Sequence, residues 1–179
     1  GTSRKVEARS CMKPVVVIAD ASPLIALARI QHLHLLREIF TDVVMTEIVQ
    51  QEVLSGGNFA DSVAIRAAIQ EGWLQVCHSP SDNDGTHLEW LDPGERSSIL
   101  LALEYQRNRH TPRLVIDEAK GRAAAQNLSL ELIGSAGIIA TAARLGLIPQ
   151  ARPLLESLRA SGYYLSQTVI ELALKSAGE

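Results

Sequence analysis

The stretch that decides the fold is VVVIADASPLIAL, residues 15–27. Its beginning, Val15–Ala19, is a continuous apolar run rich in β-branched side chains, which is typical of a strand buried on both faces. The run ends at Asp20. Ser22 and Pro23 follow as a predicted N-cap and first-turn proline, so a helix is expected to begin there.

The order of strand, acidic turn and helix recurs at Leu114–Ile116, where a short apolar run ends at Asp117 and a helix is expected from Glu118 onward. Further short strands are predicted at 43–45, 74–77 and 130–133. Helices are predicted near residues 23–28, 33–40, 47–54, 61–70, 93–107, 118–127, 134–145, 153–160 and 166–177. Strands that alternate with helices predict an α/β domain with a mainly parallel sheet covered by helices on both faces.

Length and composition favour one soluble domain. The chain has 179 residues, of which 46% are hydrophobic and only 4% aromatic, and this suits a single core of aliphatic side chains. Cys11 and Cys77 lie far apart without metal-ligand spacing, so neither a disulfide framework nor a zinc site is indicated. No apolar run is long enough to span a bilayer, and no secretory signal pattern opens the chain.

A cytoplasmic protein without a membrane segment is therefore expected. Met12 resembles a native start, so residues 1–11 are expected to be a remnant of expression or a disordered N-terminus, and the domain to occupy 12–179. Beyond residue 13 the chain carries 13 basic and 19 acidic residues, a formal charge of −6. An acidic body argues against broad, sequence-independent binding to phosphate backbones, although metal ions can offset carboxylates locally.

Two acids follow predicted strands directly, at the edge of a parallel sheet where ligands bind. Asp20 has an alternative reading as an Asx turn, but Ser22 already supplies the predicted cap, which favours a functional role. Of the pair Asp117 and Glu118, one is expected to face the strand-end crevice and the other to complement the N-terminus of the next helix. Asp117 is the preferred site residue, with Glu118 as the alternative.

Two further acids lie on predicted helices. Glu52 falls within the apolar arc that Val49 and Val53 help to define, so its carboxylate is expected to point inward and to need a metal or a basic partner. Glu95 is three residues after Asp92, the spacing of a capping box. From the residues alone, capping and function explain Glu95 equally well.

Carboxylates that converge in one crevice raise one another's pKa values unless a cation lies among them. Oxygen ligands without His or Cys select hard ions, Mg²⁺ or Mn²⁺. Such ions mostly serve hydrolysis or phosphoryl transfer, because they lower the pKa of a bound water and stabilise charge on the leaving oxygen. This chemistry is that of a nuclease.

The same residues fall in segments that resemble the PIN-domain family, in its DUF3368 branch of predicted nucleic-acid-binding proteins. The resemblance spans about Val15–Gly178. The segments are DASPLIAL (residues 20–27), EIVQQEVL (47–54), LDPGE (91–95), DEAKGR (117–122) and RPLLESLR (152–159). The resemblance implies a three-layer α/β/α fold and a metal-dependent ribonuclease with three or four acids around one or two Mg²⁺ or Mn²⁺ ions.

Carried over position by position, the implied acids are Asp20, Glu52, Glu95 and Asp117, with the hydroxyl of Ser22 orienting Asp20 or a metal-bound water. Many bacterial members of the family are toxins of toxin–antitoxin pairs, so the resemblance also implies a small antitoxin partner and a homodimer.

The chain departs from the family pattern at Asp117-Glu118, where this branch usually has paired aspartates. Ser135 is a minor site candidate, because the family often has a small polar helix start there. Lys120 and Arg122 are candidates for phosphate contacts, although an exposed helix surface is the favoured interpretation for both.

The leading hypothesis is an endoribonuclease that uses a metal-bound water and, as the family implies, leaves a 5′-phosphate and a 3′-hydroxyl. One rival is a catalytically inactive PIN-like module that binds RNA or a protein. A second rival, an aspartyl-phosphate receiver, needs an acidic pair after the first strand and a lysine after the last. Asp20-Ala21 and Gly134-Ser135 supply neither.

Overall fold

The computed structural model describes residues 15–56 and 59–179. The predicted remnant or disordered segment at residues 1–11 lies outside the described residues, as does Cys11.

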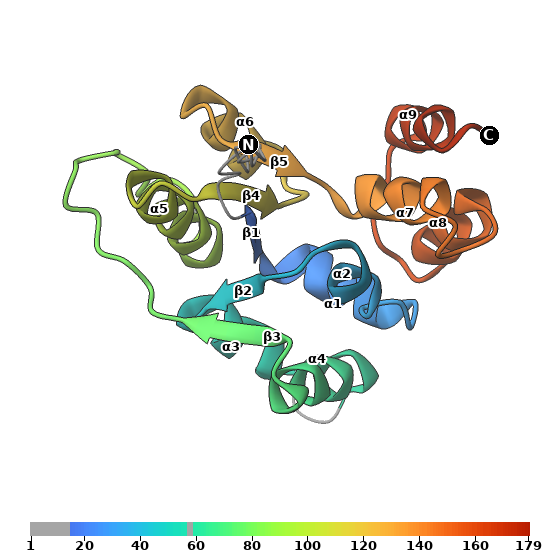
Figure 1. The fold of residues 1–179 in the computed structure, drawn as a ribbon, viewed down its shortest axis with the longest axis horizontal. Coiled ribbons are helices and arrows are strands. Elements are labelled where there is room, and N and C mark those ends of the chain that lie inside the picture. The colour runs from blue at the N-terminus through green and yellow to red at the C-terminus, as the bar shows by residue number, and fades with distance from the viewer. Residues whose placement is uncertain (1–14, 57–58) are drawn as a thin grey trace, which may run out of the picture.

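The described chain builds a five-stranded, all-parallel sheet with the order β3-β2-β1-β4-β5 (Figure 1). The strands are β1 (Val15–Ala19), β2 (Val43–Thr46), β3 (Leu74–Cys77), β4 (Thr111–Val115) and β5 (Glu131–Ile133). β1 is central, and its Ile18 pairs with Val44 of β2 and with Leu114 of β4. Because all strands run the same way, their carboxyl ends meet at one edge of the sheet.

Helices cover both faces of the sheet, which confirms the predicted three-layer α/β/α architecture. The helices are α1 (Ala21–Arg29), α2 (Leu35–Ile39), α3 (Glu47–Leu54), α4 (Ala60–Glu71), α5 (Pro93–Arg107), α6 (Ala119–Asn127), α7 (Ser135–Arg144), α8 (Ala151–Ala160) and α9 (Gln167–Ala177). In Figure 1, α5 and α6 lie on one side of the sheet, and α7, α8 and α9 form a group at the C-terminal end of the chain.

Successive residues of β1 point to opposite faces and enter two separate cores. Val16 and Ile18 pack with the α5–α6 helices, whereas Val17 and Ala19 pack with the helices of the other face. Both faces of β1 are therefore covered, as its unbroken apolar run predicts.

One predicted cap is wrong. Helix α1 begins at Ala21 with Asp20 in the N-cap position, so Ser22 lies inside the first turn rather than before it. Pro23 is tolerated there because the amides of a first turn have no intrahelical acceptor to lose. Asp20 occupies the cap position without a side-chain cap hydrogen bond, so its carboxylate stays available.

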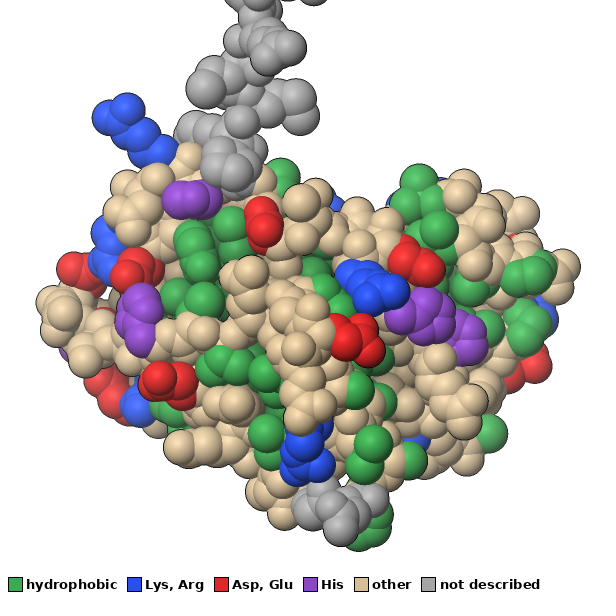
Figure 2. Space-filling model, turned by 60° about the horizontal axis from the view of Figure 1, so that its bottom comes forward, with side chains coloured by type: hydrophobic (Ala, Val, Ile, Leu, Met, Phe, Trp, Pro, Cys, Tyr) green, Lys and Arg blue, Asp and Glu red, His purple; other side chains and the backbone are tan. Residues whose placement is uncertain are grey.

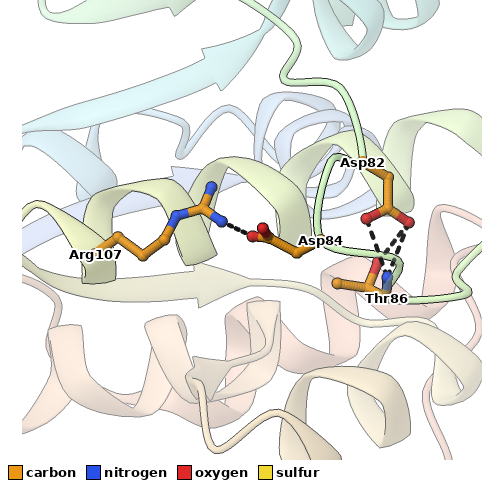
Figure 3. A network of polar contacts seen from close by, with 4 residues as sticks. All are labelled: Asp82, Asp84, Thr86 and Arg107. Atoms are coloured by element: carbon orange, nitrogen blue, oxygen red, sulfur yellow. Dashed lines mark hydrogen bonds and ion pairs between the residues drawn. The ribbon is translucent and has the colours of Figure 1, made fainter.

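The connection from β3 to α5 is a long excursion that passes along α5 before it enters that helix (Figure 1). Within it, Asp82 accepts hydrogen bonds from the amide and hydroxyl of Thr86, and Asp84 forms an ion pair with Arg107 of α5 (Figure 3). These contacts fasten the loop that leads to Asp92.

Among the described residues, no helix has the length and apolar character that crossing a membrane requires.

Candidate active site at the carboxyl edge of the sheet

Asp20 is the most deeply placed acid at this edge. Its side chain follows β1 directly and the residue is only 3% exposed. Among the described residues, Oδ1 of Asp20 has no hydrogen-bond partner. Burial raises the pKa of Asp20 to about 8; the Ala21 amide opposes this rise, and the charges of Asp92, Glu95 and Glu52 add to it.

Glu95, in the first turn of α5, is also buried, at 4% exposed. The pKa of Glu95 is raised to about 7, mainly by burial, and the charges of Asp92 and Glu118 add to the rise. The first turn of α6 lies close by, because a Cβ placed on Gly121 would stand 3.2 Å from Cδ of Glu95. Glu95 therefore lies between the end of β1 and the start of α6.

Gly94 marks the point where three carboxylates converge. A Cβ on this residue would lie 2.7 Å from Oε2 of Glu52, 3.3 Å from Oδ1 of Asp92 and 3.5 Å from Oδ1 of Asp20. Only glycine leaves that space open. The pKa of Glu52 is raised, first because the neighbouring atoms of the crevice partly desolvate its carboxyl and then by the charge of Asp92.

The expectation that Glu52 points into the interior is wrong, because the residue is exposed. Its helix α3 lies at the rim of the sheet, where Val49 and Val53 face the core and Glu52 reaches across the crevice instead. Thr46 caps α3 through the amide of Val49 and shares a buried hydrogen bond of 2.7 Å with Ser97 of α5. This contact sets the helix of Glu52 against the helix of Glu95.

Asp92 belongs to the same cluster, although the sequence indicated only a capping role. It is the N-cap of α5, and its Oδ1 accepts a hydrogen bond of 2.9 Å from the Glu95 amide. The capping function and the position beside Gly94 are both real features of this residue. The LDPGE motif contained the signal, because a glycine between two acids leaves space for their side chains to approach.

Asp117 lies in a different environment. Its Oδ1 accepts from the Ser135 amide at 2.8 Å, and its Oδ2 accepts from the Ser135 hydroxyl at 2.8 Å and from the Tyr163 hydroxyl. The structure thus brings Asp20, Glu52 and Glu95 together and ties Asp117 to α7 and to the segment between α8 and α9. Tyr163 was not a candidate from the sequence.

The auxiliary candidates also have distinct places. Ser22 is half-buried, and Ser135 is fully buried with its hydroxyl bound to Asp117. Arg122 donates a hydrogen bond of 2.8 Å to the backbone oxygen of Ile116, which occupies its guanidinium near the end of β4. Lys120 is exposed in the first turn of α6.

The residues around Gly94 suit a hard divalent cation. Within 15–56 and 59–179, no three His, Cys, Asp or Glu side chains stand close enough to hold an ion as they are placed. The donors are nevertheless all carboxylate oxygens, one of them is buried without a partner, and a glycine keeps the space between them open. A cation there would relieve the repulsion that raises the pKa values of these acids.

Charge is mixed on the face that Figure 2 shows. In the view of Figure 2, acidic and basic side chains are interspersed and neither sign forms a continuous patch on that face.

A protein-family model described as DUF3368, a PIN domain, matches residues 16–179. No curated protein matches the chain.

Proposed function

The chain belongs to the PIN-domain family, and from that premise we propose that it is a metal-dependent endoribonuclease. The PIN domain is a nuclease-like fold. The observation that carries the proposal is the environment of Asp20, which is 3% exposed and faces other acids, and whose Oδ1 has no hydrogen-bond partner in the part of the chain that the structure describes. An ionised group in such a place is costly unless a cation or a proton neutralises it.

Asp20, Glu52 and Glu95 are the residues we propose to hold Mg²⁺ or Mn²⁺. A bound divalent ion supplies an activated water near neutral pH and stabilises charge on the leaving oxygen of a phosphodiester. Asp20 is the rigid member of the set, because it is anchored between β1 and α1. Glu52 is the adjustable one, because its exposed side chain can move as an ion enters.

Asp92 supports this arrangement without being one of the proposed metal ligands. Its Oδ1 is used by the Glu95 amide, so it fixes the first turn of α5 and thereby the place of Glu95. Its negative charge also adds to the field that draws a cation into the crevice. Lys120, exposed in the first turn of α6, is the proposed contact for an RNA phosphate near this edge.

The toxin role, a small antitoxin, a homodimer and a cytoplasmic location stay predictions of the resemblance and the composition. The rival, an inactive module that binds RNA or protein, draws its support from the acidic body of the chain.

RNA cleavage in the presence of Mn²⁺ or Mg²⁺ tests the proposal, with wild type, Asp20→Asn and wild type plus EDTA compared on one substrate. Wild type is expected to cut, and both the substitution and the chelator are expected to abolish cleavage. An Asp20→Asn protein that cuts as fast as wild type would remove the basis of the proposal. Tight, metal-independent RNA binding without turnover would favour the inactive module.

A further inference from the structure

Asp117 and Glu118 are two adjacent acids that follow β4 and Ile116, and the directions of their side chains distinguish them. The extended pairing continues past β4, since the Ile116 amide donates to the Ile133 oxygen at 3.0 Å. Val115 packs in the core of the α1–α7 face, whereas Ile116 packs in the α5–α6 core. Alternation along the extended chain then directs Asp117 to the α7 side and Glu118 to the α5 side.

Asp20 follows the same rule. Ile18 packs in the α5–α6 core, so Asp20, two residues later, is directed toward α5 and Glu95. Asp20 and Glu118 therefore share one face of the sheet edge, and Asp117 is on the other.

The contacts of Asp117 agree with this direction. Its carboxylate accepts three hydrogen bonds, two from Ser135 at the start of α7 and one from Tyr163. A Cβ on Gly134 would stand 2.7 Å from Oδ1 of Asp117, so glycine is what lets the carboxylate reach the helix start. The N-terminus of α7, a helix of 10 residues, favours an anion at this place.

Moving Asp117 into the cluster around Gly94 would break these bonds. Ser135 is completely buried, so its hydroxyl would lose its acceptor in a place that water does not reach. Leaving buried donors unpaired is costly. The hydrogen bonds of the Asp117 carboxylate thus hold it against the start of α7 and against Tyr163.

Glu118 has no such commitment. It occupies the N-cap position of α6 but makes no side-chain cap hydrogen bond, and it is exposed. Gly121, three residues later, lies against the Glu95 carboxylate, because a Cβ placed on it would stand 3.4 Å from Oε2 of Glu95. The N-cap of α6 therefore places beside the cluster an acid whose side chain makes no cap hydrogen bond among the described residues.

We infer that Glu118 is the fourth carboxylate of the site, and that Asp117 is instead an anchor which, through Tyr163, fastens the segment between α8 and α9 to the sheet edge. The Glu118 half of this inference rests on the proposed metal-dependent function. The Asp117 half does not, because it concerns hydrogen bonds within the chain.

Four variants separate the two roles: Glu118→Ala, Asp117→Ala, Tyr163→Phe and the control Glu38→Ala. Glu38 is an exposed acid in α2, at the opposite edge of the sheet where β2 begins. Mn²⁺ affinity is measured by electron paramagnetic resonance of the free ion, and stability by thermal unfolding without metal.

We expect Glu118→Ala to raise the Kd for Mn²⁺ about tenfold, while its Tm matches that of Glu38→Ala. Asp117→Ala and Tyr163→Phe are expected to lower the Tm by about 3 to 10 °C and to leave the Kd for Mn²⁺ within about twofold of wild type. The double variant of Asp117 and Tyr163 should have a Tm no lower than that of the less stable single variant, because each single substitution already removes the contact between the two side chains. Should Asp117→Ala fail to fold, Asp117→Asn takes its place.

The opposite pattern overturns the inference: a large loss of Mn²⁺ affinity in Asp117→Ala with none in Glu118→Ala, or losses of Tm that add fully in the double variant. If wild type binds Mn²⁺ and cuts RNA, and Glu118→Ala binds Mn²⁺ as tightly as wild type, the assignment of Glu118 is refuted while the proposed function stands. A wild type that binds no Mn²⁺ refutes both the function and the Glu118 assignment, and the Tm measurements still decide the anchor.

Discussion

Substituting Gly94 with alanine adds one methyl group at the point where the carboxylates meet. That methyl carbon would lie 2.7 Å from Oε2 of Glu52 and 3.5 Å from Oδ1 of Asp20. The first distance is too short for contact, so the Glu52 carboxylate must move. It can do so cheaply, because the side chain is exposed and flexible.

The expected change in stability is small, since alanine is favoured over glycine in a helix by roughly 0.5–1 kcal/mol and this gain offsets the displacement of Glu52. The expected change in metal binding is large. The methyl group fills the space between the acids and displaces one of them, so we predict that the Kd for Mn²⁺ rises at least about tenfold, or 1.4 kcal/mol, and that cleavage of RNA is lost.

Three measurements on Gly94→Ala check this prediction: Mn²⁺ titration, RNA cleavage and urea unfolding. Glu52→Gln is the matched comparison, because it removes a charge and keeps the space open. If Gly94→Ala unfolds like wild type and also binds Mn²⁺ and cuts RNA like wild type, the space beside Gly94 is not where the ion binds.

Three further predictions follow from the same contacts. The pKa of Asp20 rises from 3.8 to about 8 on folding, so the free energy of unfolding of the metal-free protein should fall as pH rises from about 4 to 8. Asp20→Asn should remove that loss and raise the free energy of unfolding at pH 8 by about 5 kcal/mol relative to wild type, which urea titrations at several pH values will measure. Thr46→Val removes the cap of α3 and the hydrogen bond to Ser97. It should lower the free energy of unfolding in urea by about 1–2 kcal/mol and weaken Mn²⁺ binding. Unchanged Mn²⁺ affinity would mean that this contact does not position Glu52. Lys120→Ala should weaken RNA binding without affecting Mn²⁺ affinity, and it should reduce the salt dependence of RNA binding by about one phosphate contact. Filter binding at several salt concentrations measures this dependence, and equal slopes for Lys120→Ala and wild type would exclude the contact.

The sequence predicted the bounds of two strands closely. The run at Val15–Ala19 and the weaker one at Leu74–Cys77 became β1 and β3 as expected. β4 begins at Thr111, three residues before the predicted Leu114, and includes Pro112. Proline lacks a donor and argues against an inner strand, so the pattern stopped short, although β4 pairs with both β1 and β5.

The candidate site could be predicted less completely, for geometric reasons. Helical periodicity placed Glu52 on the inner arc of α3, but it contains no information on how near that helix lies to the rim of the sheet. The DxxE spacing identified Asp92 as a cap, but not that a cap can also lie beside an ion site. Tyr163 is 46 residues away from Asp117 in the chain, and no local pattern links two residues at that distance.

The adjacent pair Asp117-Glu118 shows where a family motif stops being informative. The motif assigns a role to a position, and the side chain's direction depends on where the extended chain ends. Here the extended pairing reaches Ile116, and a shift of one residue would exchange the two directions.

The most direct test of the central claim is anomalous scattering from crystals of the protein soaked in Mn²⁺. We predict a peak beside Gly94, within coordination distance of Oδ1 of Asp20 and of the Glu95 carboxylate, that is absent in crystals of Asp20→Asn. A peak only elsewhere in the molecule, or the same peak in both proteins, would contradict the proposal that this cluster of acids is the metal site.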